Sequence, residues 1–163
     1  MDDLVVPIAV AGAIACLAMD AWQQILMRVT GIPATNWALV GRWFVMGLKN
    51  KTMYQPTIDQ AESVSGELKL GWIVHYSVSM LYAIIYSFLM HVGAIEPTVA
   101  DGFVFGAASV VVPWFYFMPC MGKGIMGKYT ANPSKACLIS LSSHLVYGTA
   151  MGTAFLLLQG GVR

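Results

Sequence analysis

Residues 4–27 of this chain read LVVPIAVAGAIACLAMDAWQQILM and are apolar almost throughout. The only formally charged side chain among them is Asp20. A helix that crosses a lipid bilayer needs roughly 20 mostly apolar residues, and this stretch is long enough. Because an isolated carboxylate in hydrocarbon is costly, we expect Asp20 to face a polar group inside the protein rather than lipid.

The rest of the chain has a similar composition. Of its 163 residues, 58% are hydrophobic and 10% are charged, whereas a soluble domain carries about 25% charged residues. Three further stretches, at about residues 71–93, 102–121 and 136–158, are also apolar enough to span a bilayer. We therefore predict an all-α integral membrane four-helix bundle, with residues 1–163 forming a single transmembrane domain. A soluble bundle is the competing class, and it is disfavoured because its helices rarely stay apolar on every face.

The basic residues predict the orientation of this bundle. Eight of the nine, all except Arg163, gather in the connection between the first two spans and in the connection between the last two, at Arg28, Arg42, Lys49, Lys51, Lys69, Lys123, Lys128 and Lys135. Residues 91–101, between the second and third spans, contain no Lys or Arg. The positive-inside rule then places both long connections in the cytoplasm and both termini outside. The net charge of +1 gives no strongly basic face for nucleic acid, so the lipid bilayer is the expected partner.

We predict an additional helix in the first connection. Residues 36–50, NWALVGRWFVMGLKN, carry apolar Trp37, Val40, Phe44 and Leu48 at helical spacing and end in basic residues. This pattern is typical of an amphipathic helix that lies at a membrane interface, here the cytoplasmic one. Packing of the same apolar face against the inner end of the bundle explains the pattern equally well.

Each predicted span carries small and polar residues on one face. Such faces let membrane helices pack closely, since lipid supplies no hydrophobic drive between them. The GxxxG pairs Gly102/Gly106 and Gly148/Gly152 fit this role and are also candidates for contacts in a homo-oligomer. The four faces comprise Gly12, Cys16, Asp20 and Gln24; His75, Ser79, Tyr82 and Tyr86; Gly102, Gly106, Ser109, Pro113, Tyr116 and Cys120; and Ser140, His144, Gly148 and Gly152.

Three ionisable side chains fall at a similar depth. Asp20, His75 and His144 lie eight, six and nine positions from the nearest basic residue at the cytoplasmic edge, which corresponds to roughly 12, 9 and 13 Å along a helix. We therefore predict that they form a buried polar site in the cytoplasmic half of the bundle, with Tyr76 and Gln24 beside them. Asp20 is expected to contact a histidine there.

Our first interpretation of this site is proton-coupled permeation or transport of a small solute. Histidine titrates near neutral pH, and a neighbouring carboxylate can exchange a proton with it. Ionisable residues within spans often mark ion or substrate pathways. Arg42 and Glu67, just cytoplasmic of the site, would form its entrance and guide a charged solute.

Two other interpretations stay open. Asp20, His75, Cys120 and His144 have ligand-type side chains, so the second hypothesis is a membrane-embedded site for a divalent metal or haem, in a binding protein or an enzyme acting on a lipid-soluble substrate. Against it, no two of these four residues have the i, i+3 or i, i+4 spacing common in helical metal sites. The third hypothesis is a structural accessory subunit. The sequence does not decide whether the protein is an enzyme, and it names no cofactor.

Short motifs distributed over nearly the whole chain form a recognisable pattern. They are Asp20, Gly41-Arg42-Trp43, Gly66-Glu67, Gly71-Trp72, His75-Tyr76, Pro119, Gly122, Gly124, Thr130, Asn132-Pro133, Ser140, His144 and Gly148. With these motifs the chain resembles a group of small bacterial integral membrane proteins, domain-of-unknown-function family 2938. It differs at Met118, where the family often has glutamine, and near Cys137, where the family often has arginine. The resemblance implies a four-pass protein of the bacterial inner membrane, and it implies no particular activity.

Overall fold

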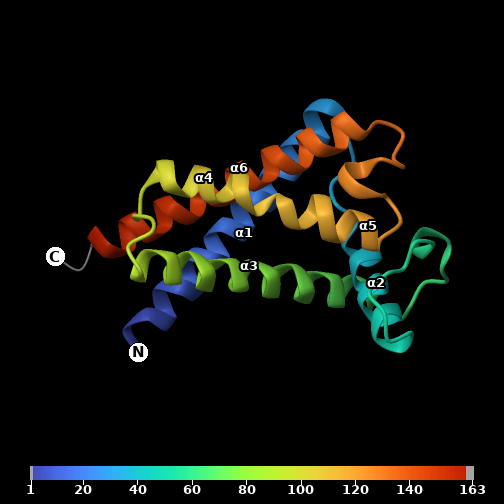
Figure 1. Ribbon diagram of the computed structural model, residues 1–163, viewed down its shortest axis with the longest axis horizontal. Helices are drawn as coiled ribbons and strands as arrows, with labels where there is room; N and C mark the ends of the chain where they lie inside the picture. The colour runs from blue at the N-terminus through green and yellow to red at the C-terminus, as the bar shows by residue number, and fades with distance from the viewer. Residues whose placement is uncertain (1, 161–163) are drawn as a thin grey trace. The chain divides into compact units, whose positions relative to one another are not determined.

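The computed structural model describes residues 2–160, with side chains for residues 5–158, and these residues form helices and no strand. The α-helices are α1 (Asp2–Thr30), α2 (Trp37–Lys49), α3 (Glu67–His91), α4 (Val99–Ser109), α5 (Met118–Cys120) and α6 (Pro133–Gly160), as labelled in Figure 1. Shorter helical turns lie between them at Ile58–Gln60, Pro113–Phe117 and Ile125–Gly127. The prediction of an all-α protein is confirmed.

Four stretches of helix are long and apolar enough to cross a membrane, so the chain is a multi-pass membrane protein, as predicted. They are Val5–Thr30, Glu67–His91, Val99–Cys120 and Pro133–Leu158. The last three begin three or four residues earlier than we predicted, at 67, 99 and 133 rather than 71, 102 and 136. The reason is that polar side chains such as Glu67 and Asp101 occupy the first turns of their helices, where an acidic group interacts favourably with the helix N-terminus.

The chain forms two compact units, which are described separately. The first contains residues 2–34, 76–109 and 141–160, and the second contains residues 35–75 and 110–140. The core of the first unit combines alanines of α1, α3 and α6 with large side chains. Its buried members, at most 4% exposed, are Ala11, Ala15, Ala83, Tyr86, Tyr147, Met151, Ala154 and Phe155.

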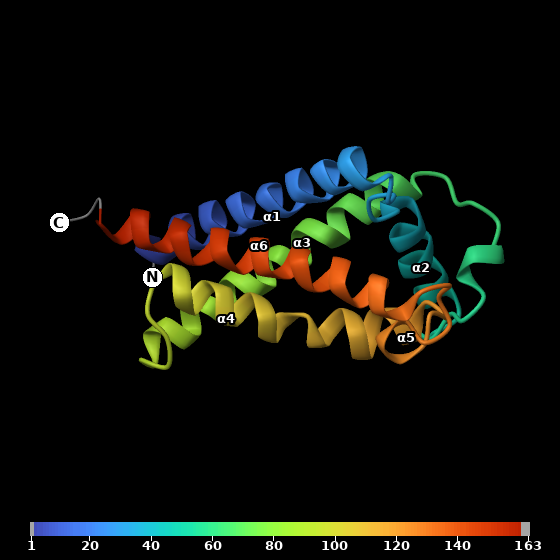
Figure 2. The ribbon, with the colours of Figure 1, turned by 90° about the horizontal axis from the view of Figure 1, so that it is seen from above.

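In the first unit, α4 and α6 lie side by side (Figures 1 and 2) with two glycines of each helix at their contact. A Cβ atom added to Gly102, Gly106, Gly148 or Gly152 would collide with backbone atoms across this contact. The GxxxG faces therefore pack against each other within one chain, as membrane helices commonly do. The glycines of these faces thus contact each other within the chain, and a homo-oligomer stays a prediction.

The helix of the third span is distorted around Pro113. Proline has no N–H group, so the carbonyl of Ser109, four residues earlier, has no helical donor at this position. The hydroxyl of Tyr82 donates a hydrogen bond to that carbonyl at 3.2 Å. Beyond this point the chain runs through the π-helical turn Pro113–Phe117, and Tyr116 is 44% exposed. The polar face that we predicted for this span is therefore correct up to Ser109, and it ends where the helix changes its pitch.

In the second unit, α2 is the helix predicted between the first two spans. Asn36 caps its N-terminus by accepting a hydrogen bond from the N–H of Leu39 at 3.2 Å. The buried face consists of Leu39, Gly41, Trp43 and Gly47, whereas Leu48, which we assigned to that face, is 63% exposed. The buried face differs from the predicted one because α2 packs most closely against the rest of the unit at its glycines. A Cβ atom on Gly41 would collide with the backbone of Glu67, at the start of α3.

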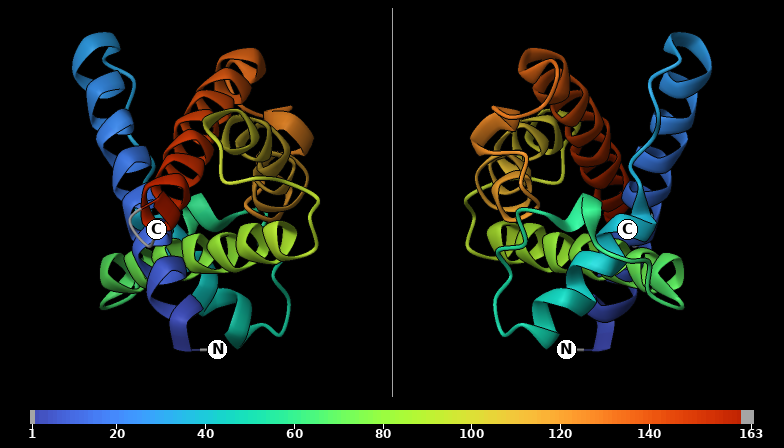
Figure 3. Two further views of the ribbon diagram at one scale, coloured as in Figure 1. Left: turned by 90° about the vertical axis from the view of Figure 1, so that its left-hand side faces the viewer. Right: turned by 90° about the vertical axis from the view of Figure 1, so that its right-hand side faces the viewer.

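The connection between α2 and α3 packs against α2 in the second unit (Figure 3). Trp43, which is 2% exposed, donates a hydrogen bond from its indole nitrogen to the carbonyl of Met53 at 2.8 Å. Ile58 joins Leu39, Trp43 and Met121 in a small core. The buried face of α2 thus contacts protein.

Candidate functional site

Asp20 lies in α1, and its carboxylate has a hydrogen-bond partner on α3. Its Oδ2 atom accepts a hydrogen bond of 3.3 Å from the hydroxyl of Tyr76, and both side chains are half-buried. Both residues were predicted members of the site. Because the interior of a bilayer offers no water to solvate a carboxylate, such a protein partner lowers the cost of placing Asp20 in a span.

A second polar contact joins α1, α3 and α6 in the core of the first unit. The hydroxyl of Ser79 donates to the carbonyl of Gly12 at 2.8 Å. The hydroxyl of Tyr147 donates to the carbonyl of Ser79 at 2.9 Å, and it lies 3.2 Å from the Ser79 hydroxyl. Ser79 and Tyr147 are each 3% exposed. Sequence reasoning missed Tyr147, although it follows His144 by three residues and so lies on a neighbouring part of the same helix face.

His144 is buried, and its imidazole meets α4. Its Nδ1 atom lies 2.7 Å from the hydroxyl of Ser109, which also lies 2.8 Å from the carbonyl of Gly106. The Ser109 hydroxyl has one hydrogen, so it can donate to only one of these two groups at a time. When Ser109 donates to Gly106, Nδ1 must carry a proton and donate to Ser109. When Ser109 donates to Nδ1, that nitrogen must be unprotonated. The direction in which the Ser109 hydroxyl donates thus depends on whether Nδ1 of His144 carries a hydrogen.

Tyr82 completes a set of polar side chains along α3. Its ring contacts the ring of His144 edge-on, with centroids 6.4 Å apart, and that of Tyr147, with centroids 5.9 Å apart. Tyr76, Ser79 and Tyr82 follow one another at steps of three residues, which keeps them on neighbouring positions of one helix face. We call the whole set the polar row: Asp20, Tyr76, Ser79, Tyr147, Tyr82, His144 and Ser109. It joins α1, α3, α4 and α6 within the first unit.

His75 belongs to the second unit, where it lies among aromatic rings. Its imidazole stacks on the indole of Trp37, with centroids 3.8 Å apart and planes 23° apart, and Trp72 lies 5.8 Å away. His75 is 8% exposed. Sequence reasoning did not foresee this aromatic surrounding. A direct contact of Asp20 with either histidine stays a prediction.

Gln24, which we placed beside the site, is exposed, whereas Gln23 is buried. The reason is geometric. Three steps of four residues, from Gly12 to Gln24, rotate by about 120° beyond full turns of a 3.6-residue helix. Gln23 returns to within about 20° of Gly12 and therefore lies on the packed face. Sequence reasoning also missed Trp22 in this region. Its indole nitrogen donates a hydrogen bond to the hydroxyl of Ser142 at 3.0 Å.

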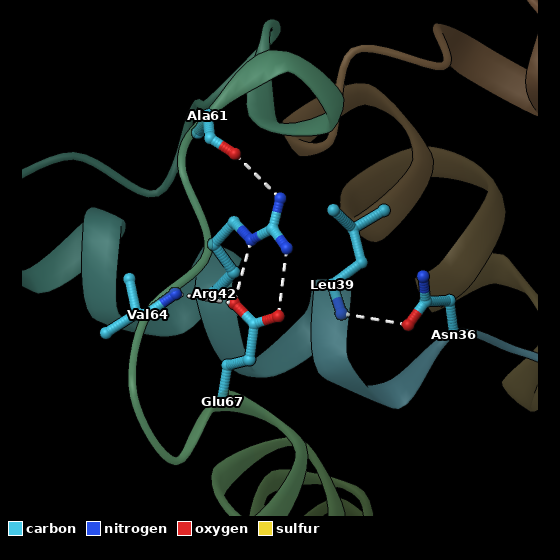
Figure 4. A network of polar contacts seen from close by, with 6 residues as sticks. All are labelled: Asn36, Leu39, Arg42, Ala61, Val64 and Glu67. Atoms are coloured by element: carbon cyan, nitrogen blue, oxygen red, sulfur yellow. Dashed lines mark hydrogen bonds and ion pairs between the residues drawn. The ribbon is translucent and has the colours of Figure 1, made fainter.

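Arg42 and Glu67, the predicted entrance residues, form a two-point ion pair in the second unit (Figure 4). The Nε and Nη2 atoms of Arg42 donate to the two carboxylate oxygens of Glu67 at 2.8 and 2.9 Å. Nη1 donates to the carbonyl of Ala61 at 2.7 Å, and the N–H of Val64 donates to Glu67 at 2.9 Å. The hydrogen bonds to Glu67 raise the pKa of the Arg42 guanidinium above its usual value. The pair ties α2, the connection and the start of α3 together.

The residues of the metal hypothesis divide between the two units. Asp20 and His144 belong to the first, and His75 and Cys120 belong to the second. Sequence reasoning left out Cys16, which is fully buried and precedes Asp20 by four residues. This pair has the i, i+4 spacing that the four proposed ligands lack, and it offers a thiol and a carboxylate on one face of α1.

Comparison with known proteins identifies a family. A family model described as "Protein of unknown function (DUF2938)" matches residues 9–157, a range that contains every member of the polar row. No curated protein matches the chain, and no solved structure matches it. Since the match extends over far more than half of the sequence, the chain belongs to the DUF2938 family.

Proposed function

We propose that this protein resides in a bacterial inner membrane and carries out proton-coupled permeation or transport of a small solute. The observation that supports this function is the polar row. It places one carboxylate, one imidazole and several hydroxyls on membrane-spanning helices, where polar groups are expensive and often mark ion or substrate pathways. A purely apolar contact would hold the helices together at lower cost.

The chemistry of the polar row suits the movement of protons. The carboxylate of Asp20 and the imidazole of His144 are the two groups of the polar row that can each take up and release a proton. Tyr76, Ser79 and Tyr147 carry hydroxyls that both donate and accept hydrogen bonds. A proton that moves between such groups need not leave an isolated charge in the bilayer. We assign Asp20 and His144 the exchange of protons and the hydroxyls between them the relay.

We give Arg42 and Glu67 a different part in this function from the one expected from sequence. Their charges are directed at each other, at distances of 2.8 and 2.9 Å, so they attract an external charged solute weakly. We propose that they hold the connection between α2 and α3 in a fixed position within the second unit.

Proton flux in liposomes tests the proposal. The purified protein is reconstituted around a pH-sensitive dye, and a potassium diffusion potential then drives protons inward. We expect flux above that of empty liposomes and at least a tenfold lower rate for Asp20→Asn, because the amide cannot release a proton at this position. Asp59→Asn, which changes an exposed carboxylate of the second unit, is the matched control and should keep the wild-type rate.

Two results would overturn the proposal. Wild-type liposomes that are no more permeable to protons than empty ones, with and without added small solutes, would exclude proton coupling. An Asp20→Asn rate equal to that of wild type would exclude Asp20 from the pathway.

The pair of Cys16 and Asp20 favours a metal site as the second candidate function. A thiolate and a carboxylate are ligands for zinc and related metals. Elemental analysis and a visible spectrum of the purified protein distinguish the two functions. A stoichiometric metal that is lost in Cys16→Ala would support the metal site, and absence of stoichiometric metal would exclude it.

A further inference from the structure

The segment between α5 and α6, in the second unit, exposes large apolar side chains at its tip. Ile125 is 57% exposed, Met126 is 41% exposed and Tyr129 is 73% exposed. We call these three residues the apolar tip. Exposed apolar groups that stand close together on a surface often mark an interaction site.

The backbone holds the apolar tip in place. Met126 has a φ angle of 51°, in the left-handed region that a residue with a side chain rarely adopts. Its carbonyl accepts a hydrogen bond from the thiol of Cys137 at 3.1 Å. The N–H of Tyr129 donates to the carbonyl of Lys123 at 2.9 Å, and the hydroxyl of Thr130 donates to Gly127 at 2.7 Å. A backbone conformation of this kind is costly and persists only where the surrounding structure enforces it.

The same segment is basic. Residues 110–140 contain Lys123, Lys128 and Lys135 and no Asp, Glu or Arg. The ammonium group of Lys128 lies 5.8 Å from the centre of the Tyr129 ring. Lys123 thus precedes the apolar tip in sequence and Lys128 lies within it, directly before Tyr129, and residues 110–140 contain no acidic side chain that could neutralise them.

The position of the segment between two spans decides what it faces. The third span ends at Cys120 and the fourth begins at Pro133, so twelve residues must connect two helices at one face of the bilayer. A connection this short stays at the lipid headgroups. Apolar and aromatic side chains beside lysines are the combination that inserts into the interface of an anionic bilayer.

We propose that the apolar tip, with Lys123 and Lys128, binds anionic phospholipid headgroups of the bilayer in which the protein resides. The lysines contact the headgroup phosphates, and Ile125 and Met126 reach into the boundary of the acyl chains. This binding is independent of the proposed transport function, because no residue of the polar row takes part in it.

Native mass spectrometry measures the binding on the full chain in mild detergent. The protein is titrated with phosphatidylglycerol and, separately, with phosphatidylcholine. We expect the protein to retain phosphatidylglycerol in preference to phosphatidylcholine. The double variant Lys123→Gln/Lys128→Gln should bind phosphatidylglycerol more weakly, by about fivefold for each lysine that it lacks. Lys123→Arg/Lys128→Arg should keep the preference. The control Lys49→Gln/Lys51→Gln removes the same number of positive charges, at the end of α2 and just after it. It should change the preference for phosphatidylglycerol much less.

Hydrogen–deuterium exchange locates the site on the wild-type protein and does not depend on any variant. In nanodiscs that contain phosphatidylglycerol and phosphatidylcholine, the amides of residues 121–132 should exchange more slowly than in phosphatidylcholine alone. Equal exchange in the two lipids would overturn the proposal. Equal protection by inorganic phosphate added to phosphatidylcholine nanodiscs would also overturn it, because the segment would then bind any soluble anion.

Discussion

At the residue scale, several polar side chains of the first unit form hydrogen bonds to groups on other helices. Asp20 of α1 meets Tyr76 of α3, and Tyr147 of α6 meets Ser79 of α3. The lipid interior cannot replace a lost hydrogen bond with one to water. Each of these side chains therefore depends on its partner more directly than a surface residue of a soluble protein does.

Tyr147→Phe tests this dependence at a single oxygen. The variant removes the hydroxyl that donates to Ser79 and leaves the aromatic ring in the core. We expect it to lower the free energy of unfolding by about 0.5–1.5 kcal/mol, the usual net value of one hydrogen bond. Denaturant titration in mixed micelles measures this change. Tyr129→Phe, at a 73% exposed position, should have almost no effect, and equal stabilities of the two variants would contradict the prediction.

At the scale of the helices, close contacts between backbones set the packing. Gly148 of α6 faces Gly102 and Gly106 of α4 so closely that any side chain would meet backbone atoms. Gly12 of α1 has more room, since a Cβ atom there would meet the Ala83 side chain at 3.2 Å and the flexible end of Met80 at 3.4 Å. A methyl group added at Gly148 would therefore have to displace backbone atoms, whereas one added at Gly12 would meet only side-chain atoms.

Gly148→Ala should consequently cost more than Gly12→Ala. We expect about 1–3 kcal/mol of destabilisation for Gly148→Ala, the range measured when a packed core receives extra atoms. For Gly12→Ala the better helix propensity of alanine, about 1 kcal/mol, offsets part of the crowding. Thermal unfolding of both variants in the same detergent measures the order. A Gly148→Ala protein as stable as wild type would contradict the close contact of α4 with α6.

The helices also show what sequence could and could not predict. Long apolar runs fix the four spans, because crossing a bilayer requires length and hydrophobicity that are visible in any sequence. The faces were harder to predict. A stripe drawn at four-residue steps drifts around the helix, which led us to Gln24 instead of Gln23. Gly41 and Gly47 lie on the packed face of α2, but glycine contributes little to a hydropathy pattern, so sequence did not reveal this face. In the third span, the distortion at Pro113 ends the buried polar face at Ser109, whereas a straight helix would have continued it.

At the scale of the whole molecule, the orientation in the membrane stays a prediction from the distribution of basic residues. Alkaline phosphatase, which is active only outside the cytoplasm, tests it when fused after Arg163 in a bacterial host. We expect an active C-terminal fusion and an inactive fusion placed after Lys49, because the first connection carries most of the basic residues. Activity in the second fusion and none in the first would reverse the orientation.

His144 is buried in the first unit and hydrogen-bonded to Ser109, whose hydroxyl lies 2.7 Å from its Nδ1 atom. Solid-state NMR of the protein with ¹⁵N-labelled histidine, reconstituted in bilayers, detects this hydrogen bond at the imidazole nitrogen itself. His75→Gln and His91→Gln assign the His144 signals. We predict that Ser109→Ala shifts the Nδ1 resonance of His144, because it removes the hydroxyl 2.7 Å away, and that Ser87→Ala, at another buried serine, does not. A His144 Nδ1 resonance that Ser109→Ala leaves unchanged would show that this hydrogen bond does not form in the membrane.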